Sequence, residues 1–197
     1  LWNEKKDFSM VEVAIESYYE LYNMLYDTEN WTYCVKYIKH AISLANKVRK
    51  KDIADKYIQE LVKTVIEVNG ADKLYFSISI IEFLLEYNVE DLVSLLAVLD
   101  NIINNTSDNI DRVEKAYSLK TTIHNKKNDK AAAKENQLQL ALYFENISEI
   151  KDDIRSLYIA EKNLEKAILI YKSEGKKEEL ERATRKLLEV QKEIPKY

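Results

Sequence analysis

Apolar side chains recur every three or four residues along most of the chain, which is the period of an α-helix with one buried face. The first such series consists of Val11, Ala14, Ile15, Tyr18, Tyr22 and Leu25. Ser9 precedes this series and Glu12 follows three residues later, a spacing typical of the capping box at a helix N-terminus. The pattern therefore predicts a first helix that begins at Ser9 and ends before the polar run 27–30.

The same period predicts further helices, separated by short polar runs. Their expected starts lie near residues 9, 30, 52, 72, 90, 109, 130, 153 and 176. Asp52 and Asp152 or Asp153 are suited to N-caps, because their carboxylates can accept the first unpaired backbone N–H groups. Gly70 and Gly175 are expected at helix C-termini, and the last helix is expected to end before Pro195.

Composition supports an all-α fold. The 197 residues include two glycines and one proline, too few for the many tight turns of a β-sandwich or barrel. The two glycines are far apart, which excludes a glycine-rich phosphate loop. Nine helices of similar length with short connections give antiparallel neighbours, and pairs of helices repeat about every 40 residues. We expect stacked helical hairpins, an α-solenoid, with a compact helical bundle as the alternative.

The chain is expected to form a single all-helical domain over residues 1–197. The run 101–111 is rich in Asn, Ser and Asp, and it is the candidate hinge between two helical halves. Residues 78–85 and 92–99 are the most apolar part of the chain, so their helices are expected at the centre of the stack. A dimer or interdomain contact is the alternative use of this apolar surface.

The last two predicted helices carry a family resemblance. In the first of them the small Ala167 is followed one turn later by Tyr171, Gly175 comes next, and the second helix continues the apolar series. The residues are Ala160, Leu164, Ala167, Ile168, Tyr171, Leu180, Ala183, Leu187 and Leu188. Residues 131–193 thus resemble tetratricopeptide (TPR-like) helical repeats. The chain is also similar to the N-terminal helical regions of larger bacterial proteins of unknown function. These resemblances imply a helical-repeat fold and a binding role.

Charge and cysteine content set the broad class. The net charge of −4 is mild, which argues against a general nucleic-acid binder. Cys34 is the single cysteine and is expected to be a small buried side chain. No apolar run approaches the roughly 20 residues of a membrane span, and we expect a cytoplasmic location. Because the chain begins with Leu1 rather than Met, we expect it to be a piece of a longer polypeptide or a trimmed chain.

Signals for catalysis are sparse. His40 and His124 are the only histidines, and neither has a glutamate three residues before it, as a di-iron site would need. Cys34 and His40 are six residues apart and fall on different sides of one helix, which argues against a nucleophilic pair. We predict no catalytic residue, no metal site and no cofactor.

Charged residues are unevenly distributed. Residues 30–51 contain no acid but carry the bases Lys36, Lys39, Lys47, Arg49, Lys50 and Lys51. Residues 74–111 contain no base but carry seven acids. Each run could be a solvated face, the basic strip 36–51 could attract an acidic or phosphate-bearing ligand, or the two segments could attract their counterparts in a second protomer.

The basic strip follows a cluster of aromatic residues. Aromatic rings beside lysines suit a peptide or single-stranded nucleic acid, although the same rings can fill the core of a helical hairpin. Tyr19, Tyr26 and Tyr33 fall off the main apolar faces and are expected to be exposed. The predicted partner-binding residues are Trp31, Tyr33, Lys36, Lys39, His40 and Lys47.

These patterns predict a non-catalytic protein-binding or scaffolding module. A concave helical surface would hold a protein or peptide, or another part of the same polypeptide. One alternative is a nucleic-acid-associated helical module that uses the basic strip 36–51. Another is an accessory N-terminal domain of a larger enzyme whose active site lies elsewhere.

Overall fold

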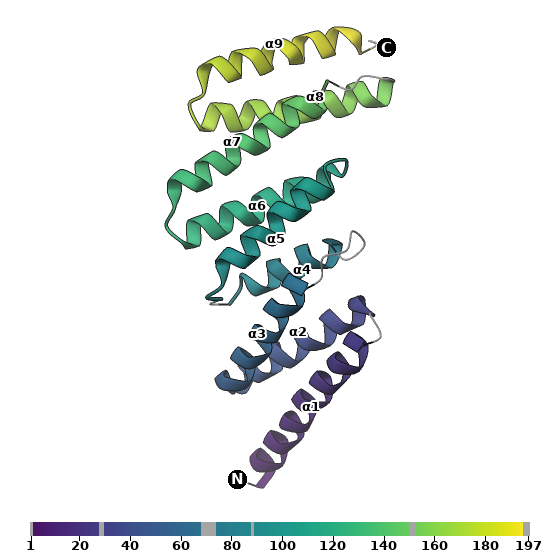
Figure 1. Cartoon of the computed structure of the whole chain (residues 1–197), viewed down its shortest axis with the longest axis vertical. Coiled ribbons are helices and arrows are strands. Elements are labelled where there is room, and N and C mark those ends of the chain that lie inside the picture. Colours follow the sequence, from purple (N-terminus) through teal and green to yellow (C-terminus); the bar gives the residue numbers. More distant parts are fainter. Residues whose placement is uncertain (1, 28–29, 68–73, 88, 150–152, 195–197) are drawn as a thin grey trace. The chain divides into compact units, whose positions relative to one another are not determined.

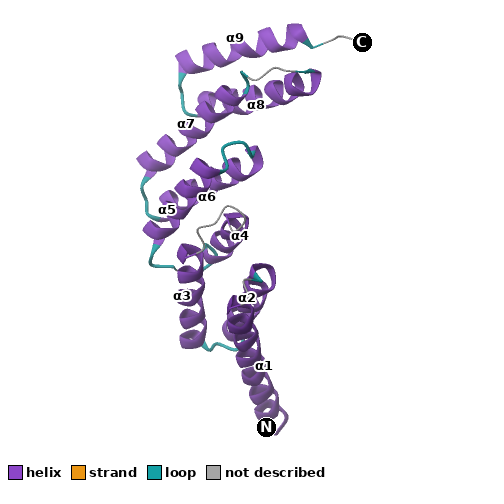
Figure 2. Cartoon of the chain, turned by 45° about the vertical axis from the view of Figure 1, so that its right-hand side comes forward, coloured by secondary structure: helices purple, strands orange, loops and turns teal. Residues whose placement is uncertain are grey.

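The computed structural model describes residues 2–27, 30–67, 74–87, 89–149 and 153–194. Within these ranges the chain is all-α, with nine helices and no strand, as the apolar period predicts (Figures 1 and 2). The helices are α1 (Trp2–Asp27), α2 (Trp31–Lys47), α3 (Lys51–Glu67), α4 (Leu74–Leu84), α5 (Leu92–Asn105), α6 (Ile110–Lys126), α7 (Lys130–Ile147), α8 (Ile154–Ser173) and α9 (Lys177–Glu193).

The chain divides into two compact units, residues 1–119 and 120–197, and the boundary falls within α6. Consecutive helices from α1 to α5 in the first unit, and from α7 to α9 in the second, pack as antiparallel neighbours, which gives the predicted stacked hairpins. The expected single domain with a hinge at 101–111 stays a prediction. Most of that polar run is helical, because α5 continues to Asn105 and α6 begins at Ile110.

In the first unit, α1 packs on α2, α2 on α3, and α4 and α5 on α3. α4 is buried on several sides, as its composition predicts, through Ile78, Ile80, Ile81 and Leu84. In α5 the residues that are fully or almost fully buried are Leu95, Val98, Leu99 and Ile102. α4 and α5 therefore contribute to the core of this unit rather than to a large exposed apolar patch.

In the second unit, α8 packs between α7 and α9. Leu157, Ala160 and Leu164 of α8 form a buried cluster with Val190 of α9. Ala167 and Tyr171 are also buried, so the small and aromatic positions that prompted the repeat resemblance lie in the helix contact.

Three helix ends share one turn geometry. After α2, α6 and α8 the chain passes through a residue with positive φ, namely Arg49 (60°), Asn128 (56°) and Gly175 (69°). In each case the next N–H donates back to a carbonyl five residues earlier, as in the bond of 2.8 Å from Lys50 N to Ala45 O. This is the Schellman arrangement, which pairs the last carbonyls of the helix. The chain can therefore turn sharply with few glycines.

Arg49→Gly is expected to stabilise the first unit by about 1 kcal/mol, because arginine in the left-handed region carries a Cβ–carbonyl repulsion of about 1–2 kcal/mol that glycine lacks. The gain is less than the whole repulsion because glycine has more freedom to lose on folding. Urea unfolding measures this difference, and Lys51→Gly, inside the first turn of α3, is the control and should destabilise. A loss of stability in Arg49→Gly would contradict the account.

Some predicted helix ends are wrong. α1 begins at Trp2, so Ser9 and Glu12 lie inside a longer helix and form no capping box at its start. α3 begins at Lys51, which places Asp52 within its first turn rather than at the cap. Asp91 and Asp153 are N-caps, and their carboxylates accept from Ser94 N and Ser156 N. The expected roles of Gly70, Asp152 and Pro195, and the expected start of the fourth helix at Asp72, fall outside the described residues.

None of the described helices is both long enough and apolar enough to cross a membrane.

Candidate binding surface on α2

Four of the six predicted binding residues lie together on one exposed stripe of α2. These are Tyr33, Lys36, His40 and Lys47, here called the α2 stripe. Successive helical residues are about 100° apart, so these four side chains fall within an arc of about 60°. All four are exposed, and the Tyr33 ring is part of the exposed apolar surface at 50 % exposure.

The opposite face of α2 fixes the orientation of the stripe. Ile38, Ala41, Ile42 and Ala45 are fully buried, which holds this side of the helix against its neighbours. Cys34 belongs to the same face, and its Sγ lies 3.8 Å from the carbonyl oxygen of Tyr22. Burial raises the pKa of the Cys34 thiol to about 12. The prediction that Cys34 is a buried apolar-type residue is confirmed.

Tyr18 of α1 borders the stripe. Its ring lies 6.0 Å from the ring of Tyr37, in a stacked arrangement, and 5.5 Å from the ring of His40. Aromatic contacts of this kind contribute beyond simple area burial, and they limit the directions available to the imidazole. His40 is therefore an exposed but positioned donor at the α1 edge of the stripe.

The other two predicted residues face elsewhere. Trp31 is partly buried, and its ring meets the Tyr26 ring edge-on at 5.1 Å. The Lys39 ammonium donates to Ser79 O at 2.8 Å and to Ser79 Oγ at 3.0 Å, and it lies 5.1 Å from the centre of the Phe83 ring. Burial lowers the pKa of Lys39. Trp31 thus belongs to the α1 contact, and Lys39 ties α2 to α4.

The expectation that Tyr19 and Tyr26 are exposed is wrong. The Tyr19 ring stacks on Tyr57 of α3 at 4.2 Å, and the Tyr26 hydroxyl donates to Glu67 Oε2 at 2.6 Å. Both tyrosines meet α3, a second neighbour of α1 that a single helical period cannot reveal. The Tyr26 ring also contacts Trp31 of α2.

Ion pairing divides the basic strip. Lys50 forms an ion pair with Glu12 of α1, whereas Lys47, Arg49 and Lys51 are exposed. In the acidic segment, Glu82 pairs with Lys115 of α6 at 2.6 Å. The exposed charge available to a ligand on α2 therefore centres on Lys36 and Lys47.

Sequence reasoning missed the most developed polar cluster, which surrounds Glu145 of α7. This carboxylate is 1 % exposed, and Arg182 of α9 donates to both of its oxygens at 2.7 Å. The Tyr171 hydroxyl of α8 donates at 3.1 Å, and the Lys186 ammonium lies 3.1 Å away. These donors, Arg182 foremost, lower the pKa of Glu145 to about 2. A signal was present, because Glu145 occupies the apolar series that Ala141 and Phe144 define.

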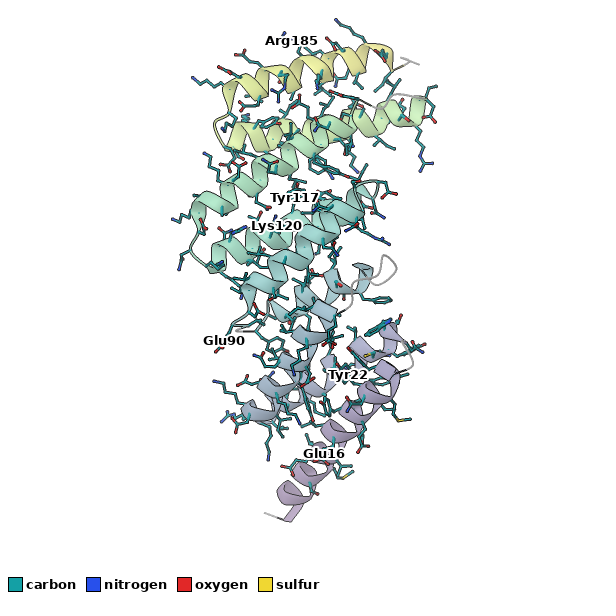
Figure 3. The ribbon with its side chains drawn as sticks, viewed as in Figure 1. Glu16, Tyr22, Glu90, Tyr117, Lys120 and Arg185 are labelled. Carbon is teal, nitrogen blue, oxygen red and sulfur yellow. The ribbon has the colours of Figure 1, made fainter. Side chains whose placement is uncertain are left out.

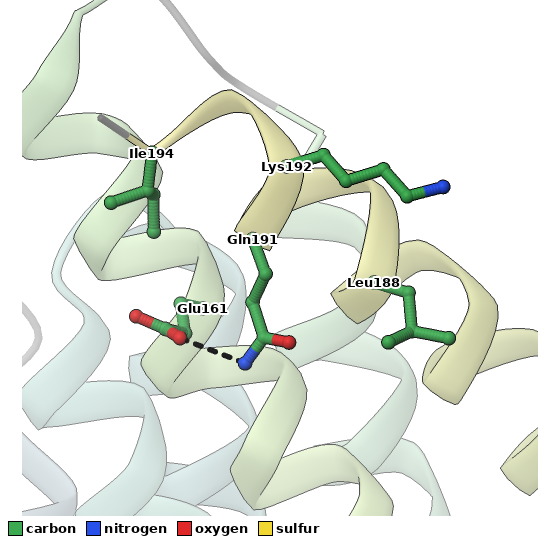
Figure 4. Close-up of a pocket in the computed structure, with 5 residues that line it drawn as sticks. All are labelled: Glu161, Leu188, Gln191, Lys192 and Ile194. Atoms are coloured by element: carbon green, nitrogen blue, oxygen red, sulfur yellow. Dashed lines mark hydrogen bonds between the residues drawn. The ribbon is translucent and has the colours of Figure 1, made fainter. Parts of the chain in front are cut away.

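The cluster around Glu145 links helices, because each hydrogen bond of this carboxylate joins α7 to α8 or α9 of the second unit. A separate surface recess lies between α8 and α9, where Gln191 Nε2 donates to Glu161 Oε1 at 2.9 Å beside Leu188, Lys192 and Ile194 (Figure 4). Among the side chains that the structure describes, no group of three or more His, Cys, Asp or Glu could hold a metal ion.

One comparison with known proteins bears on this surface. Residues 1–56 match the sequence model of a domain of unknown function (DUF7380). The match covers α1, α2 and the start of α3, and therefore includes the whole α2 stripe and its Tyr18 border. No curated protein sequence matches the chain. The family description states no activity, so function has to be argued from the surface itself.

Proposed function

We propose that the chain is a non-catalytic protein-binding or scaffolding module, and that the α2 stripe contacts an acidic peptide segment of a protein partner. The observation that carries the proposal is the alignment of Tyr33, Lys36, His40 and Lys47 on one exposed face. The ring provides apolar contact area, the two lysines attract carboxylates, and the imidazole adds a hydrogen-bonding group.

The dimensions of the stripe suit a short peptide. Lys36 and Lys47 are 11 residues apart along the helix, which at 1.5 Å per residue is about 16 Å. An extended peptide spans this distance with about five residues, at roughly 3.3 Å each. The stripe stands on a helix anchored by a fully buried face, so little ordering of the protein would oppose binding.

The repeat character of α8 and α9 is part of the same proposal. Buried Ala167 and Tyr171 and the sharp turn at Gly175 are what a TPR-like hairpin needs, and hairpins of that type act as binding scaffolds. A concave surface built from such hairpins would serve the same role.

Of the two expected alternatives, the nucleic-acid-associated module makes the different binding prediction. A nucleic-acid ligand would use Lys36, Lys47, Arg49 and Lys51, and its affinity would fall steeply with added salt. An accessory domain of a larger enzyme would bind through the same surface while its active site lies elsewhere. We favour an acidic peptide because the stripe contains only two lysines. It also presents the exposed ring of Tyr33, which offers an apolar contact beside them.

Charge reversal on the stripe tests the proposal. The probe is a labelled peptide of about ten residues that alternates Glu with Leu and Phe, compared with a labelled single-stranded oligonucleotide. Lys36→Glu with Lys47→Glu is expected to weaken peptide binding about tenfold or more, because two attractive contacts become repulsive. Fluorescence anisotropy at several salt concentrations measures both ligands.

The matched control is Lys127→Glu with Lys162→Glu, which changes net charge equally at exposed lysines of the second unit. The control should bind the peptide within about twofold of the unchanged chain. An equal loss in both double variants would show that only net charge matters and would overturn the proposal. Tighter and more salt-sensitive binding of the oligonucleotide would favour the nucleic-acid alternative.

A further inference from the structure

The outer face of α1 carries an exposed apolar stripe. Its members are Met10 (69 % exposed), Val13 (61 %), Leu21 (38 %) and Met24 (67 %), here called the α1 stripe. They recur with the three- and four-residue spacing of a coiled-coil seam, with Ser17 at the intervening position. From Met10 to Met24 the stripe is about 21 Å long.

The hairpin does not need this stripe for its own packing. The buried face of α1 contains Ile15 and Tyr22, which lie on the opposite side of the helix. Solvent-facing positions of a surface helix are usually polar, and exposed apolar residues grouped on one face mark interaction sites. α1 is thus apolar on two opposite faces, and only one of them has a neighbour within the described residues.

One edge of the α1 stripe is acidic. Glu16 and Glu20 lie three and seven residues after Val13, so they follow the Val13 side of the stripe along the helix. Glu16 is labelled in Figure 3. Residues 9–26 contain three glutamates and no lysine or arginine. Asn23 continues the edge into a recess between α1 and α3, where Glu60 is already paired with Lys63 at 3.3 Å, so the acidic character of the edge rests on Glu16 and Glu20.

The geometry points to a specific occupant: we propose that the α1 stripe docks an amphipathic helix of a partner protein that carries lysine or arginine along one flank. The apolar face of that helix would cover Met10, Val13 and Met24. Its basic flank would lie along Glu16 and Glu20, which are both exposed. Complementary charge at the edge of an apolar seam sets the choice and orientation of a partner helix.

The acidic edge also argues against a second copy of this chain as the occupant. In an antiparallel pair of α1 helices, the same edges face each other, so Glu16 and Glu20 would meet their own copies. Like charges at these positions are destabilising. The α1 stripe is distinct from the α2 stripe in position and opposite in the charge it attracts, so this inference stands independently of the proposed function.

A designed peptide provides the probe. It has about 20 residues in a heptad pattern, with Leu at the seam and Lys at both flanks, and a second peptide replaces every Lys by Glu. Fluorescence anisotropy should show saturable binding of the Lys peptide and none of the Glu peptide. Val13→Ser with Met24→Ser should weaken binding of the Lys peptide about tenfold or more, and Glu16→Lys with Glu20→Lys should do the same.

Matched controls lie in the same unit. Val93→Ser removes an equally exposed apolar side chain from α5, and Glu90→Lys reverses an exposed acid ahead of that helix. Both should leave affinity within about twofold, as should Lys36→Glu with Lys47→Glu, which separates this inference from the proposed function. All changes are at exposed positions, and circular dichroism verifies folding of each variant.

Three results would overturn the inference. The first is equal binding of the Lys and Glu peptides, and the second is an equal loss of affinity in the control variants. The third is self-association of the unchanged chain in sedimentation that Val13→Ser with Met24→Ser abolishes, because the occupant would then be a second copy.

Discussion

Replacing Glu145 with Gln is expected to destabilise the second unit by about 3 kcal/mol near neutral pH. The carboxylate lies between α7, α8 and α9 and is 1 % exposed. Arg182 donates to both of its oxygens at 2.7 Å, and the Tyr171 hydroxyl donates at 3.1 Å. Glutamine keeps the shape but loses the charge, and its NH₂ group turns a donor toward the Arg182 fork.

The pKa of Glu145 sets the size of this effect. The surrounding donors lower it from 4.5 to about 2, and a shift of one pKa unit corresponds to about 1.4 kcal/mol. Relative to the unfolded chain, the folded environment therefore favours the charged form of Glu145 over its protonated form by about 3 kcal/mol. Because removing one partner of a buried ion pair costs more than the pair contributes, Glu145→Ala should be at least as destabilising.

The lowered pKa of Glu145 also determines how the stability of the second unit depends on pH. A carboxyl whose pKa is lowered by folding stabilises the fold fully above its unfolded pKa of 4.5. That contribution is lost as pH falls from about 4.5 toward about 2, because the carboxylate becomes protonated. The stability difference between the unchanged chain and Glu145→Gln should therefore shrink over this range.

Glu149→Gln is the matched control for Glu145→Gln. Glu149 is exposed and accepts a hydrogen bond from Lys186 at 2.8 Å. It therefore forms an ion pair in the same unit, but at the surface. Exposed pairs contribute about 0–1 kcal/mol, and this variant should change stability little. Urea unfolding followed by far-UV circular dichroism compares the two, and equal losses would contradict the account of Glu145 as a buried link between helices.

Leu99→Ala is the second substitution with a large expected effect, a loss of about 2–5 kcal/mol in the first unit. Leu99 is 0 % exposed and lies on the face of α5 with Leu95 and Ile102. α5 contacts α3 and α4, so the shortened side chain would leave a cavity between packed helices.

Val93→Ala is the control for this cavity, since Val93 belongs to the same helix and is 66 % exposed. It should change the free energy of unfolding by less than about 0.5 kcal/mol. A small effect of Leu99→Ala in the same urea experiment would mean that α5 does not contribute a packed core to this unit.

The fold was predictable because it depends on local signals. The apolar period identifies all nine helices of the described residues, and the scarcity of glycine and proline excludes the other fold classes. Helix ends were less predictable where the same residues suit both a helix start and a helix interior. Ser9 and Glu12 have the spacing of a capping box, but the same residues are compatible with the interior of a longer α1.

The candidate site was predictable where one helical period determines exposure. Tyr33, Lys36, His40 and Lys47 are related by the geometry of α2 alone. The direction of the Lys39 side chain is set by its contacts with Ser79 and Phe83 of α4, and that of Tyr19 by its contact with Tyr57 of α3. These contacts join residues about 40 positions apart in the sequence. No periodic pattern in one helix specifies such neighbours.

The Glu145 cluster shows the same limit. Its partners Tyr171, Arg182 and Lys186 come from two other helices, and each is unremarkable in its own sequence context. A charged residue in an apolar series signals a buried partner without identifying it.

We propose above that the α2 stripe binds an acidic peptide segment. Amide and side-chain NMR spectra of the labelled chain, recorded while the Glu-, Leu- and Phe-containing peptide is added, test it most directly. We expect saturable shifts centred on Tyr33, Lys36, His40 and Lys47, with the second unit unchanged. Shifts confined to other surfaces, or no shifts at peptide concentrations that saturate the anisotropy signal, would contradict it.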